Sequence, residues 1–273
     1  MSPTRSRERR TPVRGRRALT SAGALALLAL SATACSEEAT RLGMPEPISE
    51  QAERMLTLWQ GSWIAAFAVG GVVWGLIIWA VLFHRKRSDD LPPQVRYNLP
   101  IEMLYTAVPF VIIAVLFYFT ARDQNYVEKT TTNNVAAVID VHGFQWSWQF
   151  DYKESLAPNA PVVASVVGIP VEPDAANKPQ VVIPAGQKVR FRLHSNDVIH
   201  SFWVPALLYK KDVVPGYVNE FEVTATKTGT YEGRCAELCG VDHSRMLFQL
   251  KVVTPAEYQK FIADSKAARG AQQ

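Results

Sequence analysis

Two long apolar runs in the first half of the chain contain no charged residue. One extends from residue 55 to 84 and the other from 103 to 121, and both are rich in Ile, Val, Leu and Phe. A hydrocarbon core of about 30 Å needs roughly 20 helical residues. The pattern therefore predicts a transmembrane hairpin over residues 55–121, with spans at about 57–84 and 102–120.

The segment between these runs, residues 85–100, carries four basic and two acidic side chains. Short loops rich in Lys and Arg usually stay on the cytoplasmic side of a membrane. We therefore expect this loop in the cytoplasm. Both chain termini are then expected on the extracytoplasmic side.

After residue 121 the hydrophobic period shortens to two. The stretch FQWSWQFD alternates strictly, which predicts one half-buried strand with Phe144, Trp146, Trp148 and Phe150 on the same face. Further alternating stretches, separated by turns that contain glycine, occur at 187–195 and 246–253. Short strands with such turns are typical of an antiparallel sandwich or barrel, which we predict over residues 122–273.

Two segments interrupt or follow these predicted strands. Residues 153–180 are rich in Pro, Ala and Asn, which favours a surface insertion. The sequence TPAE at 254–257 is a capping box with proline at the first helical position. It predicts a short C-terminal helix.

The first 34 residues have the pattern of a secretory signal peptide. Seven arginines and one acid precede an uncharged apolar run that ends in SATA, directly before Cys35. We expect cleavage there and an exported segment over 35–54. SATAC resembles a bacterial lipoprotein site in which Cys35 is lipidated, although Ala32 stands where such sites usually carry a larger aliphatic residue. Ordinary signal cleavage near Ala34 is the alternative.

Removal of this signal changes the charge of the chain. The formal net charge of +4 includes six net positive charges from residues 1–34, so the mature chain carries −2. A basic surface is the main sequence sign of a nucleic-acid partner. We therefore expect no nucleic-acid binding, and membrane lipid as one partner.

Two of the three cysteines lie in the motif RCAELCGVDHSRM, residues 234–246. Thiolate, imidazole and thioether groups are ligands that soft transition metals prefer. Two thiolates can bridge two metal ions, each of which then needs one imidazole, from His200 and His243. Met246 and a backbone carbonyl between the cysteines could serve as weak ligands. A disulfide, a reactive dithiol or a buried pair of small side chains are the alternatives.

Three stretches carry a resemblance to a known family: HSNDVIHSFWVP, KKDVVPGYVNE and CAELCGVDHSRM. They resemble subunit II of the haem–copper cytochrome c oxidases, in the lipoprotein-type form of Gram-positive bacteria, including actinobacteria. The resemblance implies a membrane-anchored all-β protein, with two spans followed by a cupredoxin-like Greek-key domain. It implies a binuclear copper centre, CuA, that accepts electrons from a cytochrome c and passes them to the haem–copper site of subunit I. The resemblance further implies that the complex couples this transfer to proton pumping across a bacterial plasma membrane.

The resemblance also implies a ligand set for two copper ions: His200, Cys235, the backbone carbonyl of Glu237, Cys239, His243 and Met246. The two cysteines bridge the ions and the histidines are terminal ligands. The Glu237 side chain is expected to bind a magnesium ion shared with subunit I. The haems and the oxygen-reducing site are expected in the partner subunit.

Two further residues take roles from the resemblance. Trp146 matches the tryptophan at which electrons enter, and Glu102 matches a glutamate at the mouth of a proton pathway. Trp146 could equally be a core aromatic, and Glu102 could be a residue at the headgroup level. Phe144 departs from the family, which often has histidine there. His142 and His194 are expected to be strand residues rather than ligands.

The expected partners are subunit I, other oxidase subunits and a cytochrome c. The insertion after Tyr152 and the lipidation predicted at Cys35 favour a membrane-tethered cytochrome as donor. Two other functions fit parts of the sequence. A quinol-oxidase subunit has the same fold without copper, but here all the copper ligands are intact. A copper-delivery protein of thioredoxin-like fold would share the cysteine spacing but lack His243 and Met246.

Overall fold

The computed structural model describes residues 37–273, apart from 88, 90, 92–93, 173 and 271–273. The chain divides into two compact units, residues 1–43 and 44–273. In the first unit a short helix, α2, spans Glu37–Thr40. The predicted signal peptide and the predicted lipidation of Cys35 lie outside the described residues.

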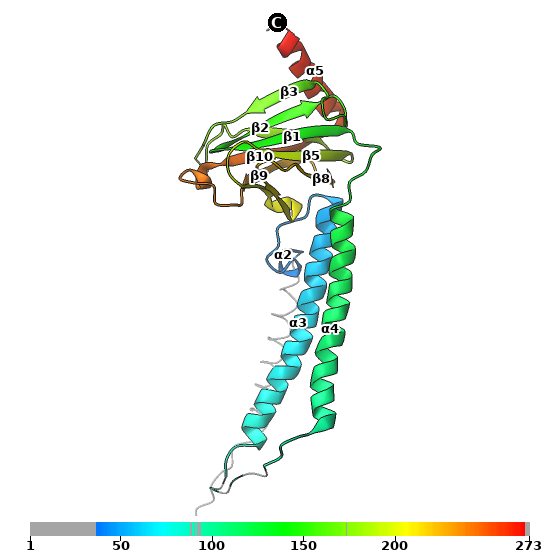
Figure 1. Cartoon of the computed structure of the whole chain (residues 1–273), viewed down its shortest axis with the longest axis vertical. Coiled ribbons are helices and arrows are strands. Elements are labelled where there is room, and N and C mark those ends of the chain that lie inside the picture. The colour runs from blue at the N-terminus through cyan, green and yellow to red at the C-terminus, as the bar shows by residue number, and fades with distance from the viewer. Residues whose placement is uncertain (1–36, 88, 90, 92–93, 173, 271–273) are drawn as a thin grey trace, which may run out of the picture. The chain divides into compact units, whose positions relative to one another are not determined.

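Two long helices, α3 (Glu50–Phe83) and α4 (Leu99–Val127), contain the two apolar runs and lie side by side (Figure 1). Ser49 begins α3 as an N-cap, because its hydroxyl accepts a hydrogen bond from the Ala52 N–H at 3.1 Å. Among the described residues, these are the two helices that are long and apolar enough to cross a membrane. The prediction of a two-helix hairpin is confirmed.

Ten strands follow within the described residues and form two five-stranded sheets, ordered β3-β2-β1-β5-β8 and β4-β10-β9-β6-β7. Neighbouring strands are antiparallel except in the pairs β1–β5 and β4–β10, which are parallel. The strands are β1 (Ala137–Phe144), β2 (Ser147–Lys153), β3 (Val162–Val167), β4 (Gln180–Pro184), β5 (Lys188–Ser195), β6 (His200–Val204), β7 (Tyr209–Val213), β8 (Asn219–Thr224), β9 (Gly229–Cys235) and β10 (Leu247–Val253).

An aromatic core joins the two sheets. The ring of Phe202 on β6 lies 5.4 Å from that of Phe191 on β5 and 4.7 Å from that of Phe248 on β10. Trp148 and Phe150 of β2 also contact Phe248. All five side chains are buried, as alternation along a strand with one face on the core requires. The prediction of a β-sandwich is therefore confirmed.

The prediction of one strand over FQWSWQFD is wrong. Strand β1 ends at Phe144 and β2 begins at Ser147, and these two residues pair across a tight hairpin. Gln145 and Trp146 form its two-residue turn, so Trp146 lies outside both strands and is half-buried against the core, whereas Trp148 is fully buried within it. The alternating pattern continues through the turn because a turn of two residues leaves the period of two unchanged.

The predicted surface insertion over 153–180 is not wholly irregular. Its residues Val162–Val167 form β3, which pairs with β2 at the edge of the sheet. Val171 and Lys178 are buried, so parts of the segment belong to the body of the domain. The high content of Pro, Ala and Asn around a short strand conceals the strand in the sequence.

The C-terminal helix is confirmed as α5, Pro255–Gly270. Its capping box is formed: the Glu257 N–H donates to the Thr254 hydroxyl, and the Thr254 N–H donates to the Glu257 carboxylate at 2.9 Å. His142 and His194 lie opposite each other on β1 and β5, with stacked rings 4.9 Å apart. They are strand residues, as expected.

Candidate metal centre

Strand pairing brings together the distant parts of the centre. His200 is the first residue of β6. Strand β6 pairs with β9, with Phe202 opposite Cys235, and the Ala236 N–H donates to the Ser201 carbonyl at 3.0 Å. This register places the His200 ring beside the cysteine at the end of β9.

The two thiols lie next to each other inside the domain. The Sγ atoms of Cys235 and Cys239 are 3.8 Å apart, too far for a disulfide, and both residues are 4% exposed. His200 Nδ1 lies 3.9 Å from Cys235 Sγ. The ligand atoms of these three residues all lie within 4.8 Å of one another, which is the spacing of a metal-binding cluster.

The remaining predicted ligands extend this cluster. His243, in a 3₁₀ turn (His243–Arg245), places Nδ1 at 3.5 Å from Cys239 Sγ. The sulfur of Met246, which is fully buried, lies 3.7 Å from the same Sγ. The carbonyl oxygen of Glu237 lies 3.2 Å from Cys235 Sγ. Each cysteine therefore has one imidazole and one weak donor beside it.

Asp197 orients the His200 ring. Its Oδ1 lies 2.7 Å from His200 Nε2, which directs Nδ1 of the same ring toward the thiols. Burial opposes ionisation of Asp197, but hydrogen bonds from His200 and from the N–H groups of Val198 and Gln145 outweigh it. The pKa of Asp197 is therefore held below its usual value. A carboxylate that fixes the tautomer of a ligating histidine is a common feature of metal sites.

The electrostatics of the cysteine pair favour a bound cation. Burial and the adjacent Cys235 raise the pKa of Cys239. Burial also opposes ionisation of Cys235, but contacts with His200 and the surrounding backbone outweigh it and lower the pKa of Cys235. Without a cation, two adjacent buried thiols do not both ionise readily. Metal-bound cysteine is a thiolate, so a bound cation would compensate the negative charge when the second thiol loses its proton. The sulfur and imidazole donors present are ligands that suit copper.

The hairpin turn between β1 and β2 directly contacts the loop between β9 and β10, residues 236–246, which carries most of the candidate ligands and is called the metal loop below. The Trp146 indole N–H donates to the Cys239 carbonyl at 3.1 Å, and the Gln145 amide donates to the same oxygen at 2.8 Å. Gly240 makes this contact feasible, because a Cβ there would lie 2.7 Å from the indole nitrogen. Trp146 is half-buried, so it connects the metal loop with the surface.

Two predicted site residues lie apart from this cluster. The Glu237 side chain is 44% exposed and forms an ion pair with Lys210 at 3.6 Å. Glu102 lies in the first turn of α4, where its carboxylate accepts a hydrogen bond from the Asn98 N–H at 2.9 Å. Its observed contact is that of a helix cap.

Sequence reasoning missed the roles of Asp197 and Gln145. Asp197 stands three residues before His200, a spacing that lets a turn bring its carboxylate to the ring, so the NDVIH stretch did contain a signal. No comparable signal exists for Gln145, because its contact with Cys239 depends on how the β1–β2 hairpin packs against a loop 94 residues later.

The fold and this donor set together define a class: a membrane-anchored β-sandwich protein with a candidate copper site. The comparisons with known proteins agree. The family described as "Cytochrome C oxidase subunit II, periplasmic domain" matches residues 137–253. The "Probable cytochrome c oxidase subunit 2" of Streptomyces coelicolor is 47% identical over 97% of this chain and 91% of its own length.

A more distant relative points the same way. Cytochrome c oxidase subunit 2 of Mycobacterium tuberculosis (strain H37Rv) is 37% identical over 92% of this chain and 82% of its own length. Among solved structures, the periplasmic domain of subunit II of cytochrome oxidase of Bradyrhizobium japonicum is 28% identical. It covers 50% of this chain and 99% of that domain, with a TM-score of 0.43. The present chain belongs to the cytochrome c oxidase subunit 2 family.

Proposed function

We propose that this chain is the electron-accepting subunit of the oxidase and that its metal loop holds two copper ions as a CuA centre. The proposed ligands are His200, Cys235, the Glu237 carbonyl, Cys239, His243 and Met246. The observation that carries the proposal is the pair of Sγ atoms 3.8 Å apart, with a histidine Nδ1 within 4 Å of each. When bound, the two copper ions supply a one-electron carrier whose charge both ions share.

The residues of the chain fit this role in three ways. The buried cysteines, His200 and Met246 exclude water from the centre. Asp197 holds His200 in one orientation, which limits movement of a ligand when the charge of the site changes. The metal loop between β9 and β10 is held at both ends by a rigid sheet, because the Cys235 N–H donates to the Met246 carbonyl at 3.0 Å.

An optical and EPR spectrum of the copper-loaded protein tests this function. We expect a purple protein with the spectrum of two coppers that share one unpaired electron, at two coppers per chain. A colourless protein, or one that binds a single copper, would refute the proposal. A single bound copper would favour the function of a copper-delivery protein. An intact oxidase without copper in this chain would favour the function of a quinol-oxidase subunit.

Trp146 is the proposed point of electron entry, and a cytochrome c is the proposed donor. The support is its half-buried position and the hydrogen bond from its indole to the carbonyl of a proposed ligand residue. The onward acceptor is proposed to be the haem–copper centre of subunit I. A membrane-tethered donor remains our prediction from the insertion and from Cys35.

The magnesium site is proposed for the Glu237 carboxylate. A carboxylate is the hard oxygen ligand that magnesium prefers, and Glu237 is partly exposed where a second subunit could supply further ligands. Lys210 would have to move away, because its ammonium group now pairs with that carboxylate. The same residue would thus serve copper with its backbone and magnesium with its side chain.

The orientation of the hairpin and the role of Glu102 are also proposals. An excess of basic residues in the loop between the spans supports a cytoplasmic loop and extracytoplasmic termini. In that orientation Glu102 lies at the cytoplasmic end of α4. Its cap hydrogen bond to Asn98 is compatible with a second role in proton uptake, which stays a prediction.

Replacing Met246 by leucine should tune the centre without destroying it. Leucine fills a similar volume, so the core should remain packed. A weak thioether ligand mainly sets the reduction potential. We expect Met246→Leu to retain both coppers. It should shift the midpoint potential, which spectroelectrochemistry measures, and slow onward transfer. Leu250→Met, on the strand β10 that follows Met246, is the control and should leave the potential unchanged. Loss of all copper in Met246→Leu would show that its role is larger.

The prediction for Cys35 concerns processing rather than electron transfer. If Cys35 is lipidated, metabolic labelling with a fatty acid should tag the mature protein and should fail to tag Cys35→Ala. Both proteins should remain in the membrane fraction, because two spanning helices hold them there without a lipid. An untagged wild-type protein would mean ordinary signal cleavage.

A further inference from the structure

Two short segments border the membrane helices, one before α3 and one after α4, and both are hydrogen-bonded to β8 or the residues after it. The segment before α3 is held by the Thr226 N–H, which donates to the Ile48 carbonyl at 2.7 Å. At the start of α3, the Gln51 side chain accepts from the Thr224 N–H at 3.2 Å. The segment before α3 and the start of α3 are therefore attached largely through backbone N–H groups of the sandwich.

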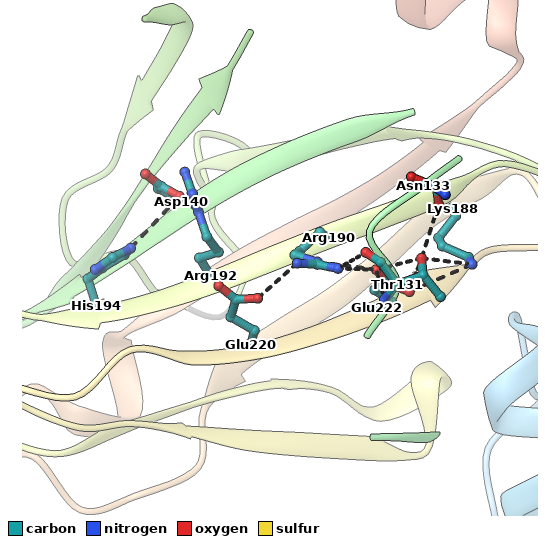
Figure 2. A network of polar contacts seen from close by, with 9 residues as sticks. All are labelled: Thr131, Asn133, Asp140, Lys188, Arg190, Arg192, His194, Glu220 and Glu222. Carbon is teal, nitrogen blue, oxygen red and sulfur yellow. Dashed lines mark hydrogen bonds and ion pairs between the residues drawn. The ribbon is translucent and has the colours of Figure 1, made fainter. Parts of the chain in front are cut away.

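The second segment, residues 128–136 between α4 and β1, is held by one backbone hydrogen bond, from the Ala136 N–H to the Lys188 carbonyl at 2.8 Å, and by a group of side chains (Figure 2). Glu222 of β8 accepts hydrogen bonds from the Thr131 N–H at 3.0 Å and from the Thr131 hydroxyl. Arg190 of β5 donates to the Thr131 carbonyl, and Lys188 donates to its hydroxyl at 3.2 Å. Every polar group of Thr131 is thus engaged by the sheet.

The charges that hold Thr131 are largely removed from water. The Glu222 side chain is 3% exposed and lies 2.6 Å from the Arg190 guanidinium, whose side chain is 12% exposed. Lys188 lies 3.7 Å from the same carboxylate. A buried carboxylate is tolerated only while its partners remain in place, so this cluster favours one position of the linker over others. Glu220 also pairs with Arg190, at 3.0 Å, but has no contact with Thr131.

Strand β5 connects this cluster with the metal centre. Lys188 and Arg190 lie at its beginning, and beyond its end at Ser195 the chain reaches Asp197 and then His200. The linker is thus attached to the strand that leads to a copper ligand and its orienting carboxylate. A displacement of the linker on the sheet would change the position of the centre relative to the membrane helices.

We propose that Glu222 is a positioning residue for electron transfer: by fixing Thr131 it holds the copper domain in place over its membrane anchor. This inference rests on the proposed function, since it concerns the step by which electrons leave the centre for a membrane-embedded acceptor. Transfer rates depend steeply on the placement of the reacting groups, and a misplacement of about 1 Å can cost on the order of a hundredfold in an enzyme. The cluster takes no part in ligating the metal.

The test compares Glu222→Gln with Glu220→Gln in the purified, intact oxidase. Glutamine has one acceptor oxygen, so at least one of the donors around position 222 loses its partner. Glu220→Gln removes a charge from the same guanidinium but leaves Thr131 held. We expect Glu222→Gln to speed hydrogen–deuterium exchange in residues 128–136. It should also slow transfer from copper to the next acceptor about tenfold, equivalent to 1.36 kcal/mol of activation free energy.

Two readouts separate positioning from general damage and from failure of the proposed function. The copper spectrum, midpoint potential and rate of reduction by the donor should be unchanged in both variants. A wild-type protein without the two-copper spectrum refutes the proposed function, whereas equal onward rates in Glu222→Gln and Glu220→Gln overturn the positioning role alone. If Glu222→Gln does not assemble, Thr131→Val decides. It removes only the hydroxyl contacts and should give a smaller change in the same direction, and no change would overturn the inference.

Discussion

Cys235→Ser and Cys239→Ser should each abolish the two-copper spectrum. A serine hydroxyl does not ionise near neutral pH, so it cannot replace a thiolate as a bridging ligand. The sulfur atoms lie 3.8 Å apart and each has its own histidine, so loss of either should leave at most one copper. Metal analysis together with EPR of the purified oxidase measures both losses.

The third cysteine provides the matched control. Cys35→Ser changes the same atom type but should leave copper content and spectrum as in the wild type. The near-isosteric change at positions 235 and 239 should leave the sandwich folded, which circular dichroism can check. A delocalised two-copper spectrum that persists in either single mutant would contradict the bridging assignment.

Trp146→Gln should slow electron entry from the cytochrome by orders of magnitude while copper content stays normal. The indole extends from the partly exposed β1–β2 turn to the Cys239 carbonyl, to which it donates a hydrogen bond at 3.1 Å. It therefore provides a short path from the surface to a proposed ligand residue. Stopped-flow reduction by the donor cytochrome measures the rate, and oxygen reduction driven by a small chemical reductant should stay near normal.

Trp148→Phe is the control for an aromatic change two residues away. Trp148 is fully buried and donates from its indole to the Met246 carbonyl at 3.3 Å. Its replacement should cost stability, about 1–3 kcal/mol, because the smaller ring leaves a cavity and the Met246 carbonyl loses its N–H donor, with little effect on entry. Wild-type entry rates in Trp146→Gln would mean that electrons enter elsewhere.

Most of the fold could be predicted from local patterns. The two apolar runs indicated α3 and α4 because hydrophobic length alone decides whether a helix spans a membrane. The capping box at Thr254 indicated α5 because its hydrogen bonds join residues three positions apart. The β1–β2 turn was missed because FQWSWQFD keeps its alternation through Gln145 and Trp146. Where the chain reverses within such a pattern depends on pairing with neighbouring strands.

The sequence by itself determined the chemistry of this protein: two spans, an exported β-sandwich, and thiol, imidazole and thioether donors in one loop. Those properties follow from side-chain type and from spacings of a few residues. Only the tertiary structure decided which distant groups meet. The β6–β9 pairing brings His200 to Cys235, the hairpin turn brings Trp146 to Cys239, and the β5–β8 pair brings Arg190 and Glu222 to Thr131. These contacts join residues from 35 to 93 positions apart, and strand register and packing of the whole domain fix them.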